Sequence, residues 1–493
     1  MISSSGDRIR QRALKATLWS GADALIRQGL QFCISIALAR LLAPEAFGTI
    51  ALLYLFVGIA GLFVDGGLSS ALIQRPATTR LEESTVFWFN LSAGAGAGLL
   101  LSAASPLIAH FFGVPLLQPL ACIMGLNLFI GAFGSVHMSL LTKVLNFRTQ
   151  MKIGLVASTV SGVAAIVVAW LGAGVWALAF QLLISTTITS LLLWVWHAWR
   201  PLRAFDPQAL RTLWRFGGFF VLSVAVDIAY TQIYTLVIGK LYGTRDLGFY
   251  FRATSTQQNA ANLLSGVLNR VAFPLFSSAA ADKELLRRSV RKALTAAMIL
   301  NLPIMFGIVV TADPLVIALF GEKWRPSVPI LQILALGGSL WPLHVINLNV
   351  LLAQGHSNLL FRVEIVKKAL GFSVLICASL FGLVAIAWSQ VAFGLAAFFI
   401  NAHYTSVLLG YGAARQIRDV APYLAVAGVM AILVWLVGSA IRLGPLAVLA
   451  IQVSIGATFY CTACKWLRLR AFQDLLTTFK ASAWPKDPEA GQA

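Results

Sequence analysis

Runs of about 20 apolar residues recur along the chain from Leu18 to Cys464, and they constrain the fold more than any other feature. A helix rises 1.5 Å per residue, so about 20 residues cross a hydrocarbon core of about 30 Å. Because a backbone inside lipid must satisfy its own hydrogen bonds, and no stretch alternates as barrel strands do, the runs predict membrane-spanning helices. With 59% hydrophobic and 11% charged residues, the chain lies outside the class of soluble domains.

Polar, glycine and proline breaks divide the chain into about fourteen such runs. The first run carries charged residues and has no signal-peptide cleavage site, so we expect it to remain as the first membrane helix. An even number of spans places both termini on one side of the membrane. The runs are centred near Gln28, Leu55, Gly98, Phe129, Ala164, Leu183, Ala229, Leu263, Pro303, Leu340, Leu375, Phe393, Leu433 and Ser454.

The basic residues divide unequally between the two faces of this topology. Of the 37 Lys and Arg residues, 28 lie in the tails and loops on the N-terminal side, six lie on the other side and three lie within spans. The positive-inside rule therefore predicts cytoplasmic termini. The basic run from Arg287 to Lys292 fits a cluster near lipid headgroups better than a nucleic-acid site, because no aromatic residues are interleaved with it.

The chain also contains an internal repeat. Arg40-Leu41 with Phe47-Gly48 recurs as Lys240-Leu241 with Leu247-Gly248, at an offset of 200. Further matches keep the same order at offsets between 208 and 214, so spans one to six repeat as spans seven to twelve. They pair Pro106-Leu107 with Pro314-Leu315, Leu117-Gln118 with Leu331-Gln332, Phe147-Arg148 with Phe361-Arg362, and Gly172 with Gly382.

The repeat predicts an all-α polytopic membrane protein with two parallel six-helix lobes. The expected domains are an N-terminal lobe of residues 1–200, a C-terminal lobe of residues 201–412, and residues 413–493 with helices 13 and 14 and a tail. Parallel repeats are typical of one class of transporters, in which the substrate path lies at the interface between the repeats. No loop is long enough for a soluble catalytic domain.

Ionisable residues inside spans are candidates for function, because each costs at least about 2.5 kcal/mol at a helix centre. In span one, Asp23 and Arg27 share a helix face and either form an ion pair that fixes packing or line a cavity. In span seven, Asp227, Tyr230 and Tyr234 have helical spacing. The tyrosines suit stacking on sugar faces or ordinary packing. Asp23 and Asp227 are the ion-coupling candidates.

Span eight carries the strongest polar signal. A polar stripe covers about 18 residues, or roughly 27 Å of helix, and has an arginine at each end. Guanidinium groups bind phosphate through forked hydrogen bonds, so the stripe suits an anionic cargo. Alternatively, Arg252 anchors the helix at the periplasmic interface and Arg270 reaches the cytoplasmic headgroups. The stripe consists of Arg252, Thr256, Asn259, Asn262, Gly266, Asn269 and Arg270.

The other motifs are weaker indications of function than the polar stripe of span eight. In span ten, Pro342 should kink the helix, and His344 suits a hydrogen-bonded packing role better than protonation. The spacing of Cys461 and Cys464 resembles a metal or redox pair, but no second pair is near, and no cysteine pair suggests a disulfide. No catalytic, nucleotide-binding or metal motif is present, so we expect no enzyme, no cofactor and no metal site.

Four segments resemble a known family. Residues 38–48 (LARLLAPEAFG) and 65–74 (DGGLSSALIQ) are similar to the opening signature of the Wzx and polysaccharide-transporter branch of the multidrug/oligosaccharidyl-lipid/polysaccharide flippase superfamily. Residues 248–253 (GFYFRA) and 267–274 (VLNRVAFP) resemble the same branch, particularly the colanic-acid-exporter-like proteins. The likeness covers about residues 10–465, and Arg252 and Arg270 match arginines of the branch pattern. The predicted fourteen spans exceed the twelve often assigned to Wzx proteins.

The resemblance implies V-shaped lobes like those of MATE and MurJ transporters. It also implies alternating access that carries an undecaprenyl-pyrophosphate-linked oligosaccharide from the cytoplasmic to the periplasmic leaflet of a bacterial inner membrane, for exopolysaccharide or lipopolysaccharide biosynthesis. The expected partners are this lipid-linked substrate, membrane lipids, and polymerase and chain-length proteins of the same pathway, with no nucleic acid. The alternatives are a multidrug antiporter of the same fold and, from another class, a membrane glycosyltransferase or polymerase.

Overall fold

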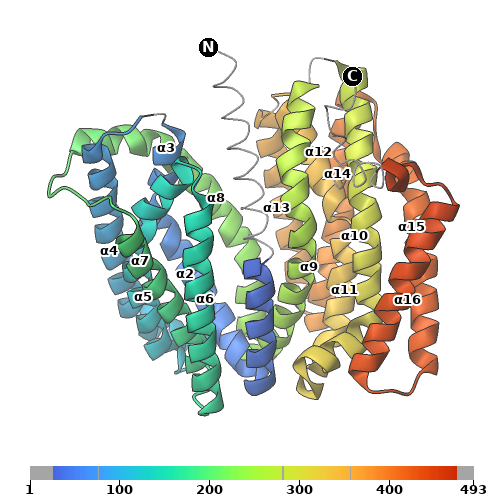
Figure 1. Ribbon diagram of the computed structural model, residues 1–493, viewed down its shortest axis with the longest axis horizontal. Coiled ribbons are helices and arrows are strands. Elements are labelled where there is room, and N and C mark those ends of the chain that lie inside the picture. Colours follow the sequence, from blue (N-terminus) through green and yellow to red (C-terminus); the bar gives the residue numbers. More distant parts are fainter. Residues whose placement is uncertain (1–25, 76, 280–281, 356, 475–493) are drawn as a thin grey trace, which may run out of the picture. The chain divides into compact units, whose positions relative to one another are not determined.

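The computed structural model describes residues 26–75, 77–279, 282–355 and 357–474. Within these ranges, the side chains of residues 215–223, 226, 227, 229, 262–275, 278, 357 and 358 are outside the description. The described chain forms helices joined by short connections, with no strand among these residues. It divides into two compact units, Met1–Phe251 and Arg252–Ala493. Each unit is a bundle of roughly aligned helices (Figure 1).

The first unit begins with a helix that includes residues 26–41. Within it, α4 packs along α5, α6 along α7, and α8 against α2, α3 and α4. The helices that follow residues 26–41 are α2 (Pro44–Asp65), α3 (Leu68–Gln74), α4 (Arg80–Phe112), α5 (Leu117–Lys143), α6 (Phe147–Trp170), α7 (Trp176–Trp196), α8 (Pro207–Leu241) and the start of α9 (Gly243–Ser278).

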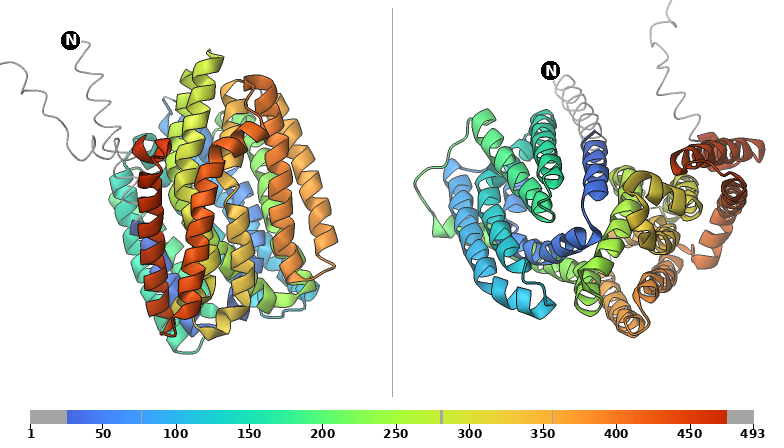
Figure 2. Two further views of the ribbon diagram at one scale, coloured as in Figure 1. Left: turned by 90° about the vertical axis from the view of Figure 1, so that its right-hand side faces the viewer. Right: turned by 90° about the horizontal axis from the view of Figure 1, so that it is seen from below.

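The second unit is organised around the long helix α10, which contacts α11, α12, α15 and α16. The pairs α13 with α14 and α15 with α16 also pack closely, and Figure 2 shows these helices nearly end-on in its right-hand view. After the rest of α9, the helices are α10 (Lys283–Phe320), the 3-10 helix η1 (Glu322–Ser327), α11 (Val328–Gly338), α12 (Trp341–Ala353), α13 (Ser357–Ala378), α14 (Leu383–Leu409), α15 (Ala413–Ala440) and α16 (Pro445–Trp466).

Local chemistry explains where several helices begin and end. At α4, Thr79 accepts a hydrogen bond from the Glu82 amide and Glu82 accepts one from the Thr79 amide, which is a capping box. Asp282 caps the start of α10 through the amides of Glu284 and Leu285. Proline occupies the first turn of α2, α8, α12 and α16, where its missing N–H leaves no helical bond unmade.

The prediction of membrane-spanning helices is confirmed, although their number is not. Ten helical segments of the described residues are long and apolar enough to cross a membrane, so the chain is a multi-pass helical membrane protein. Thirteen of the fourteen predicted centres fall in α-helices and Leu340 falls in the turn between α11 and α12. The helices at Gln28, Ala229, Leu263 and Leu375 are not among the ten, so the count of fourteen stays a prediction. The domain boundaries at residues 200 and 412 also stay a prediction.

One contact in the first unit joins two matching segments of the repeat. A Cβ atom on Gly48 would lie 1.8 Å from the Thr244 carbonyl oxygen, and one on Gly248 would lie 2.0 Å from the Pro44 carbonyl oxygen. Each contact is the counterpart of the other at the offset of 200, so the starts of α2 and α9 meet as two copies around a local two-fold axis. Only glycine allows the two backbones to approach this closely.

The charged residues beside this crossing follow the same symmetry. Glu45 and Arg245 also lie 200 residues apart, and their side chains form an exposed ion pair of 3.3 Å. Matching positions of the repeat thus carry opposite charges and pair with each other. The contact between the starts of α2 and α9 therefore shows the repeat that was found in the sequence.

Span ten is interrupted rather than kinked. The helix ends at Gly338, turns at residues 339–340 and restarts at Trp341, with Pro342 in the first turn of α12. The buried Asn301 of α10 donates to the carbonyl oxygens of Gly338 and Ser339 at 3.2 and 3.1 Å. The prediction that Pro342 kinks this helix was wrong, because the chain leaves the helical path before the proline and Asn301 satisfies the freed carbonyl groups.

Candidate functional site

Arg252 opens the second unit and is almost fully buried, with 3% of its surface exposed. Its guanidinium carbon lies 4.8 Å from the ring centre of Phe320 and 5.2 Å from that of Trp324. Both rings are themselves buried at the end of α10 and in η1. Desolvated cation–π contacts of this kind stabilise a buried guanidinium. The structure thus places Arg252 in an aromatic packing environment, and its role in substrate binding stays a prediction.

The other described candidates lie on several helices. Arg27 is exposed, and its side chain passes Gly154 of α6, where a Cβ atom would lie 3.3 Å from the Arg27 Cδ. On α8, Tyr230 is half-buried and Tyr234 is 7% exposed. Asn259 is half-buried on α9, one turn beyond the buried Thr256. Their proposed contacts with sugar or phosphate stay predictions.

Four further candidates cannot be placed by their side chains. Asp23 lies outside the described residues. Asp227 belongs to α8, and Asn262 and Arg270 belong to α9, but their side chains lie outside the description. The predicted polar stripe of span eight is therefore described only over its first half, from Arg252 to Asn259. Both predicted ion-coupling residues, Asp23 and Asp227, stay predictions.

The structure reveals an ionic pair that the sequence analysis did not single out. Lys367 lies on α13, ten residues or about 15 Å of helix beyond Ser357, and only 6% of it is exposed. Its ammonium group contacts the Glu364 carboxylate, one turn earlier on the same helix. The available signal was the match of Phe361-Arg362 to Phe147-Arg148, since the latter pair opens a helix that continues through the membrane. Lysine is rarely buried unless it is paired, so this pair is a candidate functional group.

A second polar group lies on α12 and α14 beside this pair. Asn401 is fully buried, and its Nδ2 lies 3.5 Å from Nδ1 of His344. Helix α13, which carries Lys367, packs against both α12 and α14. The long contact between Asn401 and His344 supports the predicted hydrogen-bonded packing role of His344. We call His344, Glu364, Lys367 and Asn401 the polar cluster.

The start of α15 is tied to the same unit by side chains. Asn347 of α12 and Gln416 of α15 exchange two amide hydrogen bonds of 3.0 and 2.8 Å. Tyr411, in the connection before α15, donates to Asp419 at 2.8 Å, and Arg291 of α10 donates to the other oxygen of the same carboxylate. Burial first, and then the Asp419 carboxylate, raise the pKa of Tyr411 above its ordinary value. These bonds fix the start of α15 to α10 and α12.

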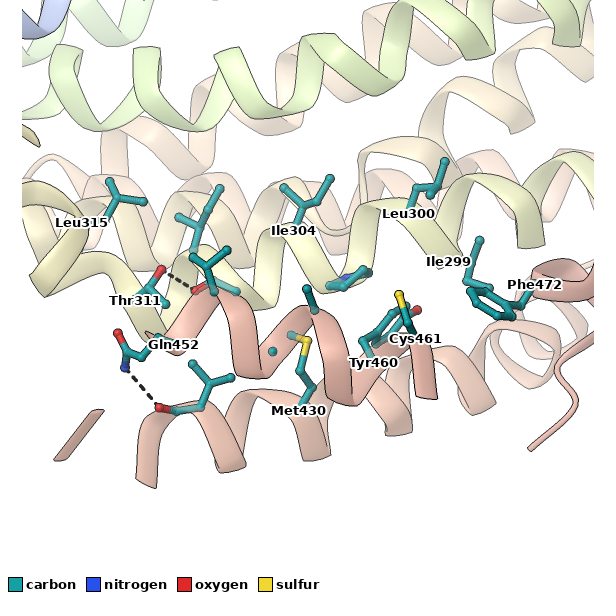
Figure 3. Close-up of a pocket in the computed structure, with 17 residues that line it drawn as sticks. Ile299, Leu300, Ile304, Thr311, Leu315, Met430, Gln452, Tyr460, Cys461 and Phe472 are labelled. Carbon is teal, nitrogen blue, oxygen red and sulfur yellow. Dashed lines mark hydrogen bonds between the residues drawn. The ribbon is translucent and has the colours of Figure 1, made fainter. Parts of the chain in front are cut away.

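An apolar pocket of about 620 Å³ lies between α10 and the α15–α16 hairpin. Figure 3 shows its lining from Leu315 and Thr311 at one end to Ile299 and Phe472 at the other. From Ile299 to Leu315, α10 advances about 24 Å. The few polar side chains of the lining include Gln452, which donates to the Val434 carbonyl oxygen, and Thr311, which donates to that of Gly307. The pocket can therefore accept an extended hydrocarbon group.

The cysteines add no metal site within the described chain. All five are free thiols, with Cys461 exposed and Cys464 buried on α16. No group of three or more His, Cys, Asp or Glu side chains with metal-binding proximity occurs among the described residues. The helices are joined by short connections, the longest described one between two helices being residues 197–206.

This architecture defines a class: a multi-pass helical membrane protein with ionisable side chains inside its bundles. The chain is similar to a structure titled lipid II flippase MurJ, inward closed conformation, with a TM-score of 0.70 at 14% identity over 93% of this chain and 100% of that one. At this identity the likeness shows the fold. The fold class expected from the sequence is thereby confirmed, apart from the number of spans.

Residues 37–329 match the model of a family described as polysaccharide biosynthesis protein, and the chain belongs to this family. It is 30% identical to the teichuronic acid biosynthesis protein TuaB of Bacillus subtilis, over 69% of this chain and 71% of that protein. It is 26% identical to the lipopolysaccharide biosynthesis protein WzxC of Escherichia coli, over 73% and 74% of the two chains. The resemblance to the Wzx and polysaccharide-transporter branch is confirmed.

Proposed function

We propose that this chain is a flippase. It would move an undecaprenyl-pyrophosphate-linked oligosaccharide from the cytoplasmic to the periplasmic leaflet of a bacterial inner membrane, by alternating access, for exopolysaccharide or lipopolysaccharide biosynthesis. Membership in the polysaccharide biosynthesis family is the observation that carries this proposal. A lipid-linked saccharide has an anionic, a polar and a hydrocarbon part, and each part makes a different demand on the protein.

The anionic part requires cations inside the membrane region. Arg27 and Arg252 are described cations within predicted spans, Lys367 is a buried cation on α13, and Arg270 adds a fourth from the sequence. A cationic interior favours a pyrophosphate over the cationic drugs that a multidrug antiporter would carry. Arg27, which is exposed, suits direct contact with phosphate better than Arg252, which is enclosed by two rings.

The hydrocarbon part requires an apolar path beside the polar one. The pocket between α10 and the hairpin is apolar along about 24 Å of helix, which matches a segment of several isoprene units. We assign helices α15 and α16, which lie outside the repeat, the task of holding the lipid tail. The two repeated lobes do not themselves require α15 and α16, so this assignment gives these two helices a function of their own.

The arginine part of the proposal is tested in the native host. Replacement of the gene by Arg27→Ala or by the double variant Arg252→Ala/Arg270→Ala should lower surface polysaccharide at least tenfold and should leave lipid-linked repeat units inside the cell. Arg252→Lys, which keeps the charge, separates a need for charge from a need for the guanidinium packing of Phe320 and Trp324. Wild-type export by both alanine variants would contradict the role of these cations.

The proposed role of the pocket between α10 and the α15–α16 hairpin is tested by filling the pocket. Ala457→Trp places an indole on the lining of the pocket, whereas Thr458→Trp, next to it on the same helix and also exposed, lies outside the lining. We expect Ala457→Trp to reduce export several-fold and Thr458→Trp to retain it, with equal amounts of both proteins in the membrane. Equal export by the two variants would remove the pocket from the proposal.

A further inference from the structure

A short segment after α16 closes one end of the apolar pocket. Helix α16 ends at Trp466, and after a turn a further short helical stretch begins at residue 470. Phe472 of this stretch lines the pocket at the same end as Ile299 of α10 (Figure 3). We call residues 467–474 the closing segment. It supplies a boundary of the pocket that belongs to neither α10 nor the two helices of the hairpin.

Two of the polar contacts that hold the closing segment are weak. Ala471 is buried, and its amide donates a long hydrogen bond of 3.4 Å to the Tyr423 hydroxyl of α15. Asp474 forms an ion pair of 3.1 Å with Lys292 of α10, in which the side chains are 52% and 71% exposed. Ion pairs so exposed contribute little to stability, because water screens the charges. A competing anion can therefore replace Asp474 at Lys292.

Lys292 lies on the same face of α10 as the lining of the pocket. Ile299 follows it by seven residues, which is two helical turns or about 10 Å. Arg288 precedes Lys292 by one turn on this face, and its side chain is 76% exposed. This face of α10 is thus cationic before the pocket and apolar along it. A lipid with an anionic head and a hydrocarbon tail has the same order of chemistry.

Positive charge dominates around this end of the pocket. Residues 282–292 carry five cations and two carboxylates, and the closing segment carries two arginines and one carboxylate. Both arginines, Arg468 and Arg470, are exposed. A diphosphate carries more negative charge than a carboxylate and binds lysine and arginine through charge-assisted hydrogen bonds. It therefore neutralises this surface better than Asp474 does.

We propose that this end of the pocket is the site where the diphosphate of an isoprenoid lipid is loaded. Without lipid, Asp474 pairs with Lys292 and Phe472 closes the pocket. When the lipid enters, its phosphates replace Asp474 at Lys292, the closing segment moves away from α10, and the tail lies along the pocket from Ile299 toward Leu315. This inference rests on the proposed flippase function and names the position at which its cargo first binds.

The pocket is accessible to a lipid in the surrounding leaflet. Leu300 and Val453 line it and are 44% and 56% exposed, so the pocket is open along its side. A hydrocarbon tail can enter sideways from the membrane, while the charged head stays at the end near Lys292. The positive-inside rule predicts that this end is cytoplasmic, and the proposed cargo starts in the cytoplasmic leaflet.

The first test measures binding with isothermal titration calorimetry. The full-length protein, purified in detergent, is titrated with farnesyl diphosphate, a short isoprenoid diphosphate. We expect Lys292→Gln to weaken binding about tenfold, because one charge-assisted contact is lost. Asp474→Asn should tighten binding about threefold, because the competing carboxylate is gone. The control Lys152→Gln, which removes an exposed lysine near the start of α6 in the first unit, should bind like wild type.

The opposite signs distinguish a loading site from a purely structural ion pair. A pair that only holds the closing segment in place is broken equally by Lys292→Gln and by Asp474→Asn, so both variants would change binding in the same direction. That result would overturn the proposal, as would wild-type binding by Lys292→Gln. Because the Lys292 side chain is 71% exposed, its replacement leaves the packing of the helices intact.

The second test separates the head of the ligand from its tail. Farnesol, which lacks the phosphates, and inorganic pyrophosphate, which lacks the chain, should each bind at least about tenfold more weakly than farnesyl diphosphate. Ala457→Trp, which fills the pocket, should weaken binding of farnesyl diphosphate, whereas Thr458→Trp should not. Equal competition by phosphatidylglycerol, an anionic phospholipid with two chains, would overturn the assignment of the site to an isoprenoid lipid.

Experiments in the native host separate this proposal from the flippase function. Wild-type binding of farnesyl diphosphate by Lys292→Gln and Asp474→Asn, together with loss of surface polysaccharide when the gene is deleted, would overturn the loading site and leave the flippase function standing. Normal surface polysaccharide in cells that lack the gene altogether would overturn the flippase function, whatever the titrations show.

Discussion

Helices α6 and α13 correspond to each other in the two repeats, yet they carry opposite chemistry at one position. Ile153 of α6 is fully buried and packs with Leu141 and Leu193 in an apolar cluster. At the matching position of α13, Lys367 is also buried and pairs with Glu364. At the starts of α2 and α9, by contrast, the repeats have kept Gly48 and Gly248 in equivalent contacts. The repeat thus preserves the backbone geometry at the glycine crossing, whereas an ionic pair stands in the second copy where the first has Gln150 and Ile153.

The largest effect is expected when the charge of the second repeat is moved to the first. Ile153→Lys would bury an ammonium group among aliphatic side chains with no carboxylate opposite it, because Gln150 occupies the position of Glu364. We expect little or no folded protein by fluorescence-detected size-exclusion chromatography. The control Ile153→Leu should behave like wild type. Normal folding of Ile153→Lys would mean that both repeats tolerate a charge at this position. It would contradict the difference inferred between α6 and α13.

The reverse change removes the charges of the second repeat, first from Lys367 alone and then from both residues of the pair. Lys367→Met leaves the Glu364 carboxylate without its lysine, which should lower the free energy of unfolding by about 3 kcal/mol, the lower end for a buried pair, because 31% of the Glu364 side chain is exposed. The double variant Glu364→Gln/Lys367→Met should regain most of this stability, because two neutral side chains replace the pair. Thermal unfolding in detergent measures both. A double variant as unstable as Lys367→Met would show that the pair itself holds the fold.

The glycine crossing tests the part of the repeat that stayed symmetric. Gly48→Ala and Gly248→Ala each place a methyl group about 2 Å from a carbonyl oxygen, so the two helices must separate. We expect both variants to lose about 3 kcal/mol of stability and to do so equally. Gly428→Ala, on α15 with open space around it, should be neutral or slightly stabilising. Unequal losses would mean that the two contacts are not equivalent.

The smallest expected effect concerns the amide pair that links α12 to α15. Asn347→Leu or Gln416→Leu alone leaves a buried amide without its partner and should lower stability by about 1 to 2 kcal/mol. The double variant should lose less than the sum of the single variants, because no partner is left unsatisfied. A double-mutant cycle of thermal unfolding measures this coupling. Strict additivity would indicate that the pair does not hold the hairpin.

The sequence predicted the parts of the fold that depend on repeated, local signals. Apolar length predicted the helices, and ordered matches predicted the repeat that the crossing of Gly48 and Gly248 displays. The break before Trp341 could not be predicted, because it depends on Asn301, about 38 residues away in sequence, to satisfy the freed carbonyl groups. A long-range partner of this kind leaves no local signal.

The candidate site was less accessible to sequence reasoning. Arg252 was expected on a helix and lies on α9, but the rings of Phe320 and Trp324 that enclose it come from a distant segment. Lys367 and Glu364 were not singled out, because hydropathy alone ends a span at the first charges. Had the repeat been used to set helix boundaries, Lys367 would have been placed opposite Ile153 and inside the membrane.

The central claim is that the protein itself moves a lipid-linked saccharide between leaflets. The direct measurement uses purified protein in liposomes that contain undecaprenyl-pyrophosphate-linked repeat units from the native host, labelled on the sugar with a fluorophore. Dithionite, which does not cross the membrane, quenches only the label in the outer leaflet. Wild-type protein should make nearly all of the label accessible within minutes, while protein-free liposomes lose only the outer-leaflet signal. Equal quenching with and without the protein would contradict the account.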